Sequence, residues 1–162
     1  MVGVLAVAAV AIYLVPVGAH LLELPNKIGL PPEQYMIVQR VYSGWALFGI
    51  AIVAALVLTL WHAWLVRSSP RAFKLALAAF ACLAATQAIF WTLTYPVNVA
   101  SANWTSMPAD FEAARRQWEY SHAASAILTL AAFLAILLSV ARAPRDAAAA
   151  GLRSGTAGGG AG

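Results

Sequence analysis

Four long stretches of this chain carry almost no ionisable side chains, and this absence of charge is the strongest constraint on its fold. They cover residues 2–24, 44–66, 73–95 and 121–141. A helix needs about 20 apolar residues to cross a bilayer, and within lipid only helices and closed barrels pair every backbone polar group. Each stretch is long enough for a helix and too uniformly apolar for a strand. The sequence therefore predicts an all-α bundle of four transmembrane helices.

The composition agrees with a membrane location. Hydrophobic residues make up 62% of the chain and charged residues 10%, whereas soluble domains average about 45–50% and about 25%. The expected partner of most of the surface is therefore the lipid bilayer. The sequence holds no basic run with interleaved aromatic residues, so nucleic acid is not an expected partner. Cys82 is the single cysteine, which excludes an internal disulfide.

Lysine and arginine are unevenly distributed over the connections, and this predicts the orientation. With four spans, the two termini and the middle connection share one side, which holds six of the ten basic residues. By the positive-inside rule we expect the N- and C-termini to be cytoplasmic. Residues 1–142 are assigned to a single transmembrane domain. Residues 143–162 are rich in Ala, Gly, Arg and Ser, and we expect a disordered C-terminal tail there.

Two of the predicted helices extend beyond the membrane. Residues 33–42 lead into the second apolar stretch and residues 108–120 lead into the fourth. Asp110 and Glu112 stand where the N-terminus of a helix favours acidic side chains. Pro96, in contrast, is expected to end the third helix. Helices two and four are therefore predicted to form a polar cap on the exterior side.

Histidine and glutamate occur in pairs on the first and fourth helices. His20 and Glu23 are three residues apart, as are Glu119 and His122, so each pair shares one helix face. Because the two helices run in opposite directions, both pairs are expected at the same depth near the exterior boundary. Such residues on facing helices build metal sites in bundles. His20, Glu23, Glu119 and His122 are therefore candidate ligands of a transition metal or haem.

Two other interpretations of these pairs remain open. His122 is a candidate general base without any metal, because histidine titrates near neutral pH. Alternatively, these polar residues have no special function. Polar side chains are expected at a membrane boundary because water is near, and each glutamate would then form an ordinary ion pair. In that case Glu23 pairs with Lys27 or Arg40, and Glu119 pairs with Arg115 or Arg116.

Further candidates come from the third helix and from the tryptophans. Gln87, Trp91 and Asn98 fall at helical spacing, on a stripe that leads from mid-membrane towards the cap. Tryptophans near the polar residues are expected to form the wall of a pocket for an aromatic molecule. The candidate substrate-binding residues are Trp91, Trp104, Trp118, Gln39 and Gln87.

Three short segments carry a resemblance to a known family. They are YPVN at 95–98, ANWT at 102–105 and RRQWEYSH at 115–122. With the overall layout up to Val140, they resemble small bacterial integral-membrane proteins related to fungal anthrone oxygenases. The resemblance implies a membrane oxidoreductase of the bacterial plasma membrane that oxidises a lipophilic aromatic compound without an added cofactor. Pro96, Asn98, Trp118 and the polar pattern ending in His122 are the positions that match.

A mechanism follows as a hypothesis. A phenolic or anthrone-like substrate stacks among the tryptophans and loses a proton to His122, while Glu119 orients the imidazole. His20 or Asn98 then stabilises the oxyanion. The alternative is a non-enzymatic membrane subunit that binds a protein partner or forms a homo-oligomer. A carrier is disfavoured because no continuous line of ionisable residues crosses the membrane.

Overall fold

The computed structural model describes residues 1–158, and it describes side chains for residues 1–143. Every regular element in this part of the chain is helical. Four helices are long and apolar enough to span a membrane, which confirms the expected fold class and is the architecture of a multi-pass membrane protein. They cover Val2–Lys27, Trp45–Leu65, Pro70–Ala100 and Phe111–Ala143.

The spanning segments are divided into shorter helical elements. In chain order these are α1 (Val2–Lys27), α2 (Pro32–Val38), η1 (Gln39–Tyr42), η2 (Trp45–Phe48), α3 (Gly49–Leu65), α4 (Pro70–Ile89), η3 (Phe90–Thr94), α5 (Tyr95–Ala100) and α6 (Phe111–Gly158).

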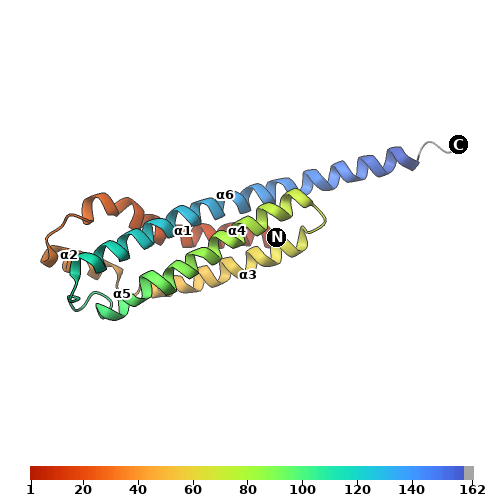
Figure 1. Ribbon diagram of the computed structural model, residues 1–162. Helices are drawn as coiled ribbons and strands as arrows, with labels where there is room; N and C mark the ends of the chain where they lie inside the picture. Colours follow the sequence, from red (N-terminus) through yellow and green to blue (C-terminus); the bar gives the residue numbers. More distant parts are fainter. Residues whose placement is uncertain (159–162) are drawn as a thin grey trace.

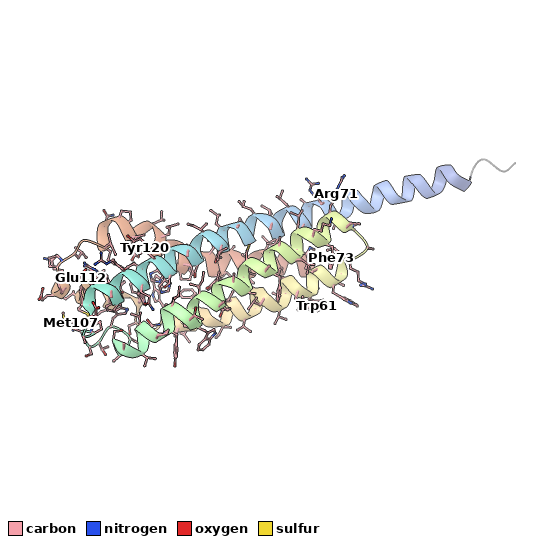
Figure 2. The ribbon with its side chains drawn as sticks, in the orientation of Figure 1. Trp61, Arg71, Phe73, Met107, Glu112 and Tyr120 are labelled. Atoms are coloured by element: carbon pink, nitrogen blue, oxygen red, sulfur yellow. The ribbon has the colours of Figure 1, made fainter. Side chains whose placement is uncertain are left out.

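The four long helices form a closed ring. Helix α1 packs against α3, α3 against α4, α4 against α6, and α6 returns to α1. At one end of the bundle lie the N-terminus and the turn between α3 and α4, and α6 projects beyond the other helices there (Figure 1). Figure 2 shows Trp61, Arg71 and Phe73 towards this end and Met107 and Glu112 at the opposite one. The side of the membrane that each end faces stays a prediction.

Small side chains form the centre of the bundle. Ala6, Ala55, Ala76, Ala79 and Ala132 come from all four long helices, and each is completely buried. In lipid the surroundings are as apolar as the core, so helices associate through close packing, and small residues allow their backbones to approach. Most of the large aliphatic side chains point outward instead, towards the expected bilayer.

Gly3 lies in a tight contact where α1 meets the ends of α3 and α6. A Cβ atom on Gly3 would stand 2.7 Å from Val140 Cγ2 and 2.9 Å from His62 Nδ1. His62 is fixed there, since its Nε2 lies 3.1 Å from Ser139 Oγ, and Ser139 Oγ donates to the Ala72 carbonyl oxygen at 2.7 Å. The contact therefore has little freedom to adjust.

Gly3→Ala should lower the free energy of unfolding by about 1–3 kcal/mol, because the added methyl overpacks this contact. Gly18→Ala is the matched control, since it lies on the same helix and its Cβ would meet nothing within 4 Å. That control should raise stability by about 0.5–1 kcal/mol, as expected for replacing glycine within a helix. Thermal unfolding in detergent measures both variants. Equal shifts in the two would contradict the close approach at Gly3.

The expected continuous extension of the second spanning helix is wrong. The chain forms α2 and η1, then breaks at Ser43 and Gly44 before the second span begins at Trp45. Gly44 has φ +84°, a left-handed conformation that glycine adopts readily and that interrupts a right-handed helix. The fourth spanning helix does extend as predicted, because α6 begins at Phe111 and continues without a break.

Pro96 does not end the third spanning helix. A π-helical turn, Phe90–Thr94, precedes it, and α5 then continues to Ala100. The wider π turn accommodates a residue that lacks an N–H and would crowd a regular helix. Gln117 Nε2 of α6 donates to the Leu93 carbonyl oxygen at 2.8 Å and so satisfies one acceptor of this irregular turn.

The disorder expected of residues 143–162 stays a prediction, and the structure describes helix over most of this segment. Helix α6 continues through residues 143–158 to Gly158. Alanine, which has the highest helix propensity, is the most frequent residue there. The last four residues of the predicted tail lie outside the described residues.

Candidate functional site

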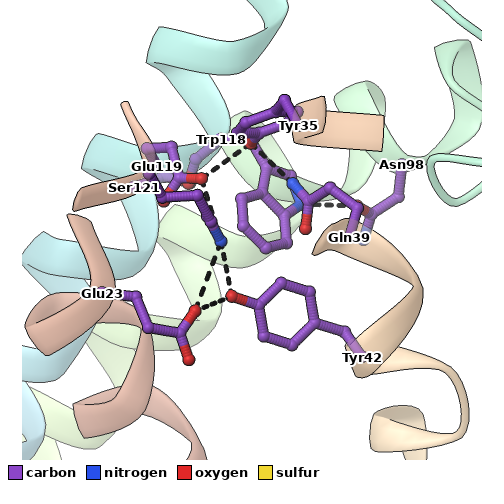
Figure 3. A network of polar contacts seen from close by, with 9 residues as sticks. Glu23, Tyr35, Gln39, Tyr42, Asn98, Trp118, Glu119 and Ser121 are labelled. Carbon is purple, nitrogen blue, oxygen red and sulfur yellow. Dashed lines mark hydrogen bonds and ion pairs between the residues drawn. The ribbon is translucent and has the colours of Figure 1, made fainter. Parts of the chain in front are cut away.

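Polar side chains from three helical segments meet at the end of the bundle opposite the N-terminus. Figure 3 shows polar contacts of this group from close by. Within each segment, successive contributing residues are three or four apart, which places them on one helix face. We call this group the buried polar cluster. It comprises His20, Glu23 and Lys27 of α1, Tyr35, Gln39 and Tyr42 of α2 and η1, and Glu119 and His122 of α6.

Lys27 lies at the centre of the buried polar cluster. It is only 2% exposed, and its Nζ stands 3.0 Å from Glu119 Oε1 and 3.5 Å from Glu23 Oε2. It also donates a hydrogen bond to the Tyr42 hydroxyl. The ring centroids of Tyr42 and Trp118 lie 4.3 and 4.9 Å from the ammonium, within cation–π range. Charge pairing and aromatic rings together stabilise a cation that water does not reach.

Two tyrosines complete the surroundings of the carboxylates. The Tyr35 hydroxyl donates to Glu119 Oε1 at 2.7 Å and accepts from Gln39 Nε2 at 2.6 Å, while the Tyr42 hydroxyl donates to Glu23. Burial, together with the neighbouring carboxylate, raises the pKa of Tyr35 and of Tyr42 above the usual value for a phenol. Both phenols therefore keep their protons and act as donors to the carboxylates.

Next to Lys27, two imidazole rings stack on each other. The ring centroids of His20 and His122 are 4.1 Å apart with an interplanar angle of 30°. Trp118 lies 4.2 Å from His122, and Tyr42 and Trp45 lie 4.4 and 5.6 Å from His20. We call Tyr42, Trp45 and Trp118 the aromatic box. His20 is 5% exposed, and its Nδ1 is buried without a hydrogen-bond partner among the described side chains, so one imidazole nitrogen is unpaired inside this box.

The orientation of Trp118 is fixed from the third spanning helix. Trp118 Nε1 donates to Asn98 Oδ1 at 2.7 Å, and its indole packs edge-on to Trp104 at 5.9 Å. Together with Tyr35 and Phe111, these tryptophans belong to a small apolar core at this end of the bundle. Asn98 thus acts on the site by positioning Trp118, and the expected role in stabilising an oxyanion stays a prediction.

Trp104 reaches that core through a strained turn. Ala102, Asn103 and Trp104 have φ of 48°, 55° and 62°, and this left-handed region costs a non-glycine residue about 1–2 kcal/mol. The backbone N–H of Asn103 donates to the Asn98 carbonyl oxygen at 2.7 Å, and that of Trp104 donates to Ser101 Oγ at 3.0 Å. Strain of this kind persists only where surrounding contacts hold it, and it is concentrated at functional sites.

Ala102→Gly should raise the free energy of unfolding by about 1 kcal/mol, because glycine adopts this φ without steric cost. The increase would appear as a higher unfolding temperature in detergent. A loss of stability would contradict the left-handed conformation of this turn.

Most of the predicted site residues come together, but two do not. His20, Glu23, Gln39, Glu119 and His122 lie in the buried polar cluster, and Asn98, Trp104 and Trp118 lie beside it. Trp91 is 60% exposed and packs against Phe90 and Tyr95 on the outer surface. Gln87 Nε2 contacts the neighbouring Thr86 Oγ1 at 3.4 Å, away from the cluster.

The predicted metal ligands are arranged around Lys27. Its ammonium lies beside both Glu23 and Glu119, where a bound cation would otherwise stand. Over residues 1–143, no three His, Cys, Asp or Glu side chains are arranged to hold a metal ion. Ligation by His20, Glu23, Glu119 and His122 therefore stays a prediction that this geometry does not support.

The role expected for Glu119, orienting His122, stays a prediction. Its Oε1 is engaged by Tyr35 and Lys27, and its buried Oε2 has no hydrogen-bond partner among the described side chains. The alternative ion pair of Glu23 with Lys27 is observed. Arg115 pairs with Glu112 at 2.6 Å instead of with Glu119.

The sequence interpretation did not recognise three central residues. Lys27 was considered only as a partner of Glu23, and Tyr35 and Tyr42 were not candidates. Their spacing was visible, since Lys27 follows His20 by seven residues, and Tyr35, Gln39 and Tyr42 repeat at four and three. That these two faces meet depends on how the chain folds back between α1 and η2.

Comparison with known proteins gives no family assignment, because no family model, no curated protein and no solved structure matches this chain. The likeness to relatives of the anthrone oxygenases rests on the three short segments and the layout alone.

Proposed function

We propose that this multi-pass membrane protein is an oxidoreductase that deprotonates a lipophilic phenolic or anthrone-like substrate for reaction with dioxygen. One observation carries the proposal. The stacked imidazoles of His20 and His122 lie inside the aromatic box, with a buried ring nitrogen of His20 that has no hydrogen-bond partner among the described side chains. The combination provides a base and a surface for a flat aromatic molecule at the same place.

The chemistry balances without a further reductant. An imidazole nitrogen takes the proton from an activated C–H bond of the substrate, and the carbanion delocalises its charge onto the substrate oxygen. This enolate passes electrons to dioxygen and forms a carbon-bound hydroperoxide after it regains a proton. Loss of water from the hydroperoxide leaves a new carbonyl group. The overall change converts a CH₂ group and O₂ into C=O and H₂O.

Lys27 gives this site its electrostatic character. The ammonium stands within 5 Å of two rings of the aromatic box, Tyr42 and Trp118. A fixed positive charge in a site that excludes water stabilises negative charge that develops nearby. The carboxylates of Glu23 and Glu119 hold Lys27 there through one oxygen each, and the proposal assigns the base to the imidazoles.

Oxygen-18 labelling tests the proposed reaction. Purified protein in detergent is incubated with anthrone under ¹⁸O₂, and protein-free micelles measure the spontaneous oxidation. We expect faster conversion than in micelles alone and one ¹⁸O atom in the new carbonyl. Conversion no faster than in the micelles would contradict the proposal and favour a structural role for the cluster in a non-enzymatic membrane subunit.

A further inference from the structure

The Tyr42 ring, one member of the aromatic box, packs against His20 and the other two members, in the place that an aromatic ligand would need. Its ring lies 4.4 Å from His20, 5.0 Å from Trp45 and 5.6 Å from Trp118. Its hydroxyl donates to Glu23 and accepts from Lys27. A phenol ring is thus already bound by aromatic contacts on its faces and edges and by two charged groups at its oxygen.

The segment that carries Tyr42 is unevenly buried. Tyr35, near its beginning, is completely buried, whereas Tyr42, at its end, is only half-buried. Gly44 follows Tyr42 by two residues with φ +84°, and a Cβ there would meet nothing within 4 Å. The chain beside Tyr42 is therefore unobstructed and depends on a backbone conformation that few residues adopt.

We propose that Tyr42 is a built-in plug in a phenol-binding site, and that rotation about Gly44 exchanges its ring for the phenol ring of a substrate. In this arrangement Glu23 and Lys27 recognise the hydroxyl of the substrate, and His20, Trp45 and Trp118 hold its ring. This inference rests on the proposed function, because it names the part of the substrate that enters the same site. Displacement of the plug brings that ring against the His20–His122 pair.

Complementation of Tyr42→Ala with p-cresol tests the site, because p-cresol is the tyrosine side chain as a free molecule. Binding is measured in detergent by tryptophan fluorescence and by the rise in unfolding temperature, with toluene as the ligand that lacks the hydroxyl. Hydrogen bonds to charged groups should make p-cresol bind about tenfold more tightly than toluene. Tyr95→Ala removes an exposed tyrosine near Trp91 and controls for partition into the micelle. Equal binding of the two ligands, or binding equal to that of Tyr95→Ala, would overturn the assignment.

A second pair of variants keeps Tyr42 in place and tests its movement. Gly44→Ala and Gly49→Ala each add a methyl group into open space, but only Gly44 has a positive φ. Alanine at Gly44 disfavours the plugged conformation, so p-cresol should bind about tenfold more tightly than to the Gly49→Ala protein. Equal affinities in the two variants would overturn the plug. This comparison holds even if Tyr42→Ala does not fold.

These outcomes are separable from those of the proposed function. Every measurement here is equilibrium binding and requires no turnover. A protein that binds p-cresol as expected but does not oxidise anthrone keeps the phenol site and loses the reaction. A protein that oxidises anthrone while Gly44→Ala and Gly49→Ala bind p-cresol equally keeps the reaction and loses the plug.

Discussion

Replacing Lys27 with methionine should lower the free energy of unfolding by about 3–5 kcal/mol, the usual effect of removing one partner of a buried ion pair. Methionine fills a similar volume but leaves Glu119 completely buried, with no ammonium beside it. The hydrogen bond from Lys27 to the Tyr42 hydroxyl is lost as well. Chemical or thermal unfolding in detergent measures the change.

The double variant Lys27→Met, Glu119→Gln separates charge from packing. It removes both members of the buried pair, so it should recover most of the stability lost in Lys27→Met. Lys74→Met is the control, because Lys74 is exposed and its replacement should change stability by less than about 0.5 kcal/mol. Similar losses in Lys27→Met and Lys74→Met would contradict the central position of Lys27 in the cluster.

His122→Ala should lower the turnover of an anthrone-like substrate by about 10²–10⁴-fold, the usual contribution of a positioned general base. His20→Ala should have a comparable effect, because His20 stacks on His122 and holds the unpartnered nitrogen. His62→Ala is the matched control, since it also removes a buried histidine but acts where α3 meets α6, on Ser139. Its turnover per folded molecule should remain near that of the unchanged protein.

The sequence predicts the fold well because the bilayer imposes one simple requirement. A long apolar stretch must form a helix to pair its backbone, so each of the four stretches identified a span. The break before the second span was missed because it depends on one glycine, Gly44, whose φ the sequence does not reveal. The prediction that the third helix ends at Pro96 was wrong because a π turn accommodates this proline.

Part of the candidate site was predicted, because the sequence shows which residues share a face of a regular helix. His20 and Glu119 were identified because helical spacing places each with its neighbour on one face. Trp91 was placed with Asn98 by the same spacing, but the π turn Phe90–Thr94 contains Trp91 and changes the number of residues per turn, so the two no longer share a face. The central position of Lys27 was not predicted, because the sequence does not show that its ammonium lies between carboxylates of two helices.

Oxygen uptake by the purified protein tests the central claim most directly. The assay compares the unchanged protein, His122→Ala and His62→Ala with anthrone in the same detergent, each corrected for protein-free micelles. The imidazole pair predicts substrate-dependent uptake in the unchanged protein and in His62→Ala, and a loss of at least about 10²-fold in His122→Ala. Undiminished uptake in His122→Ala would contradict the role of the paired imidazoles as the base.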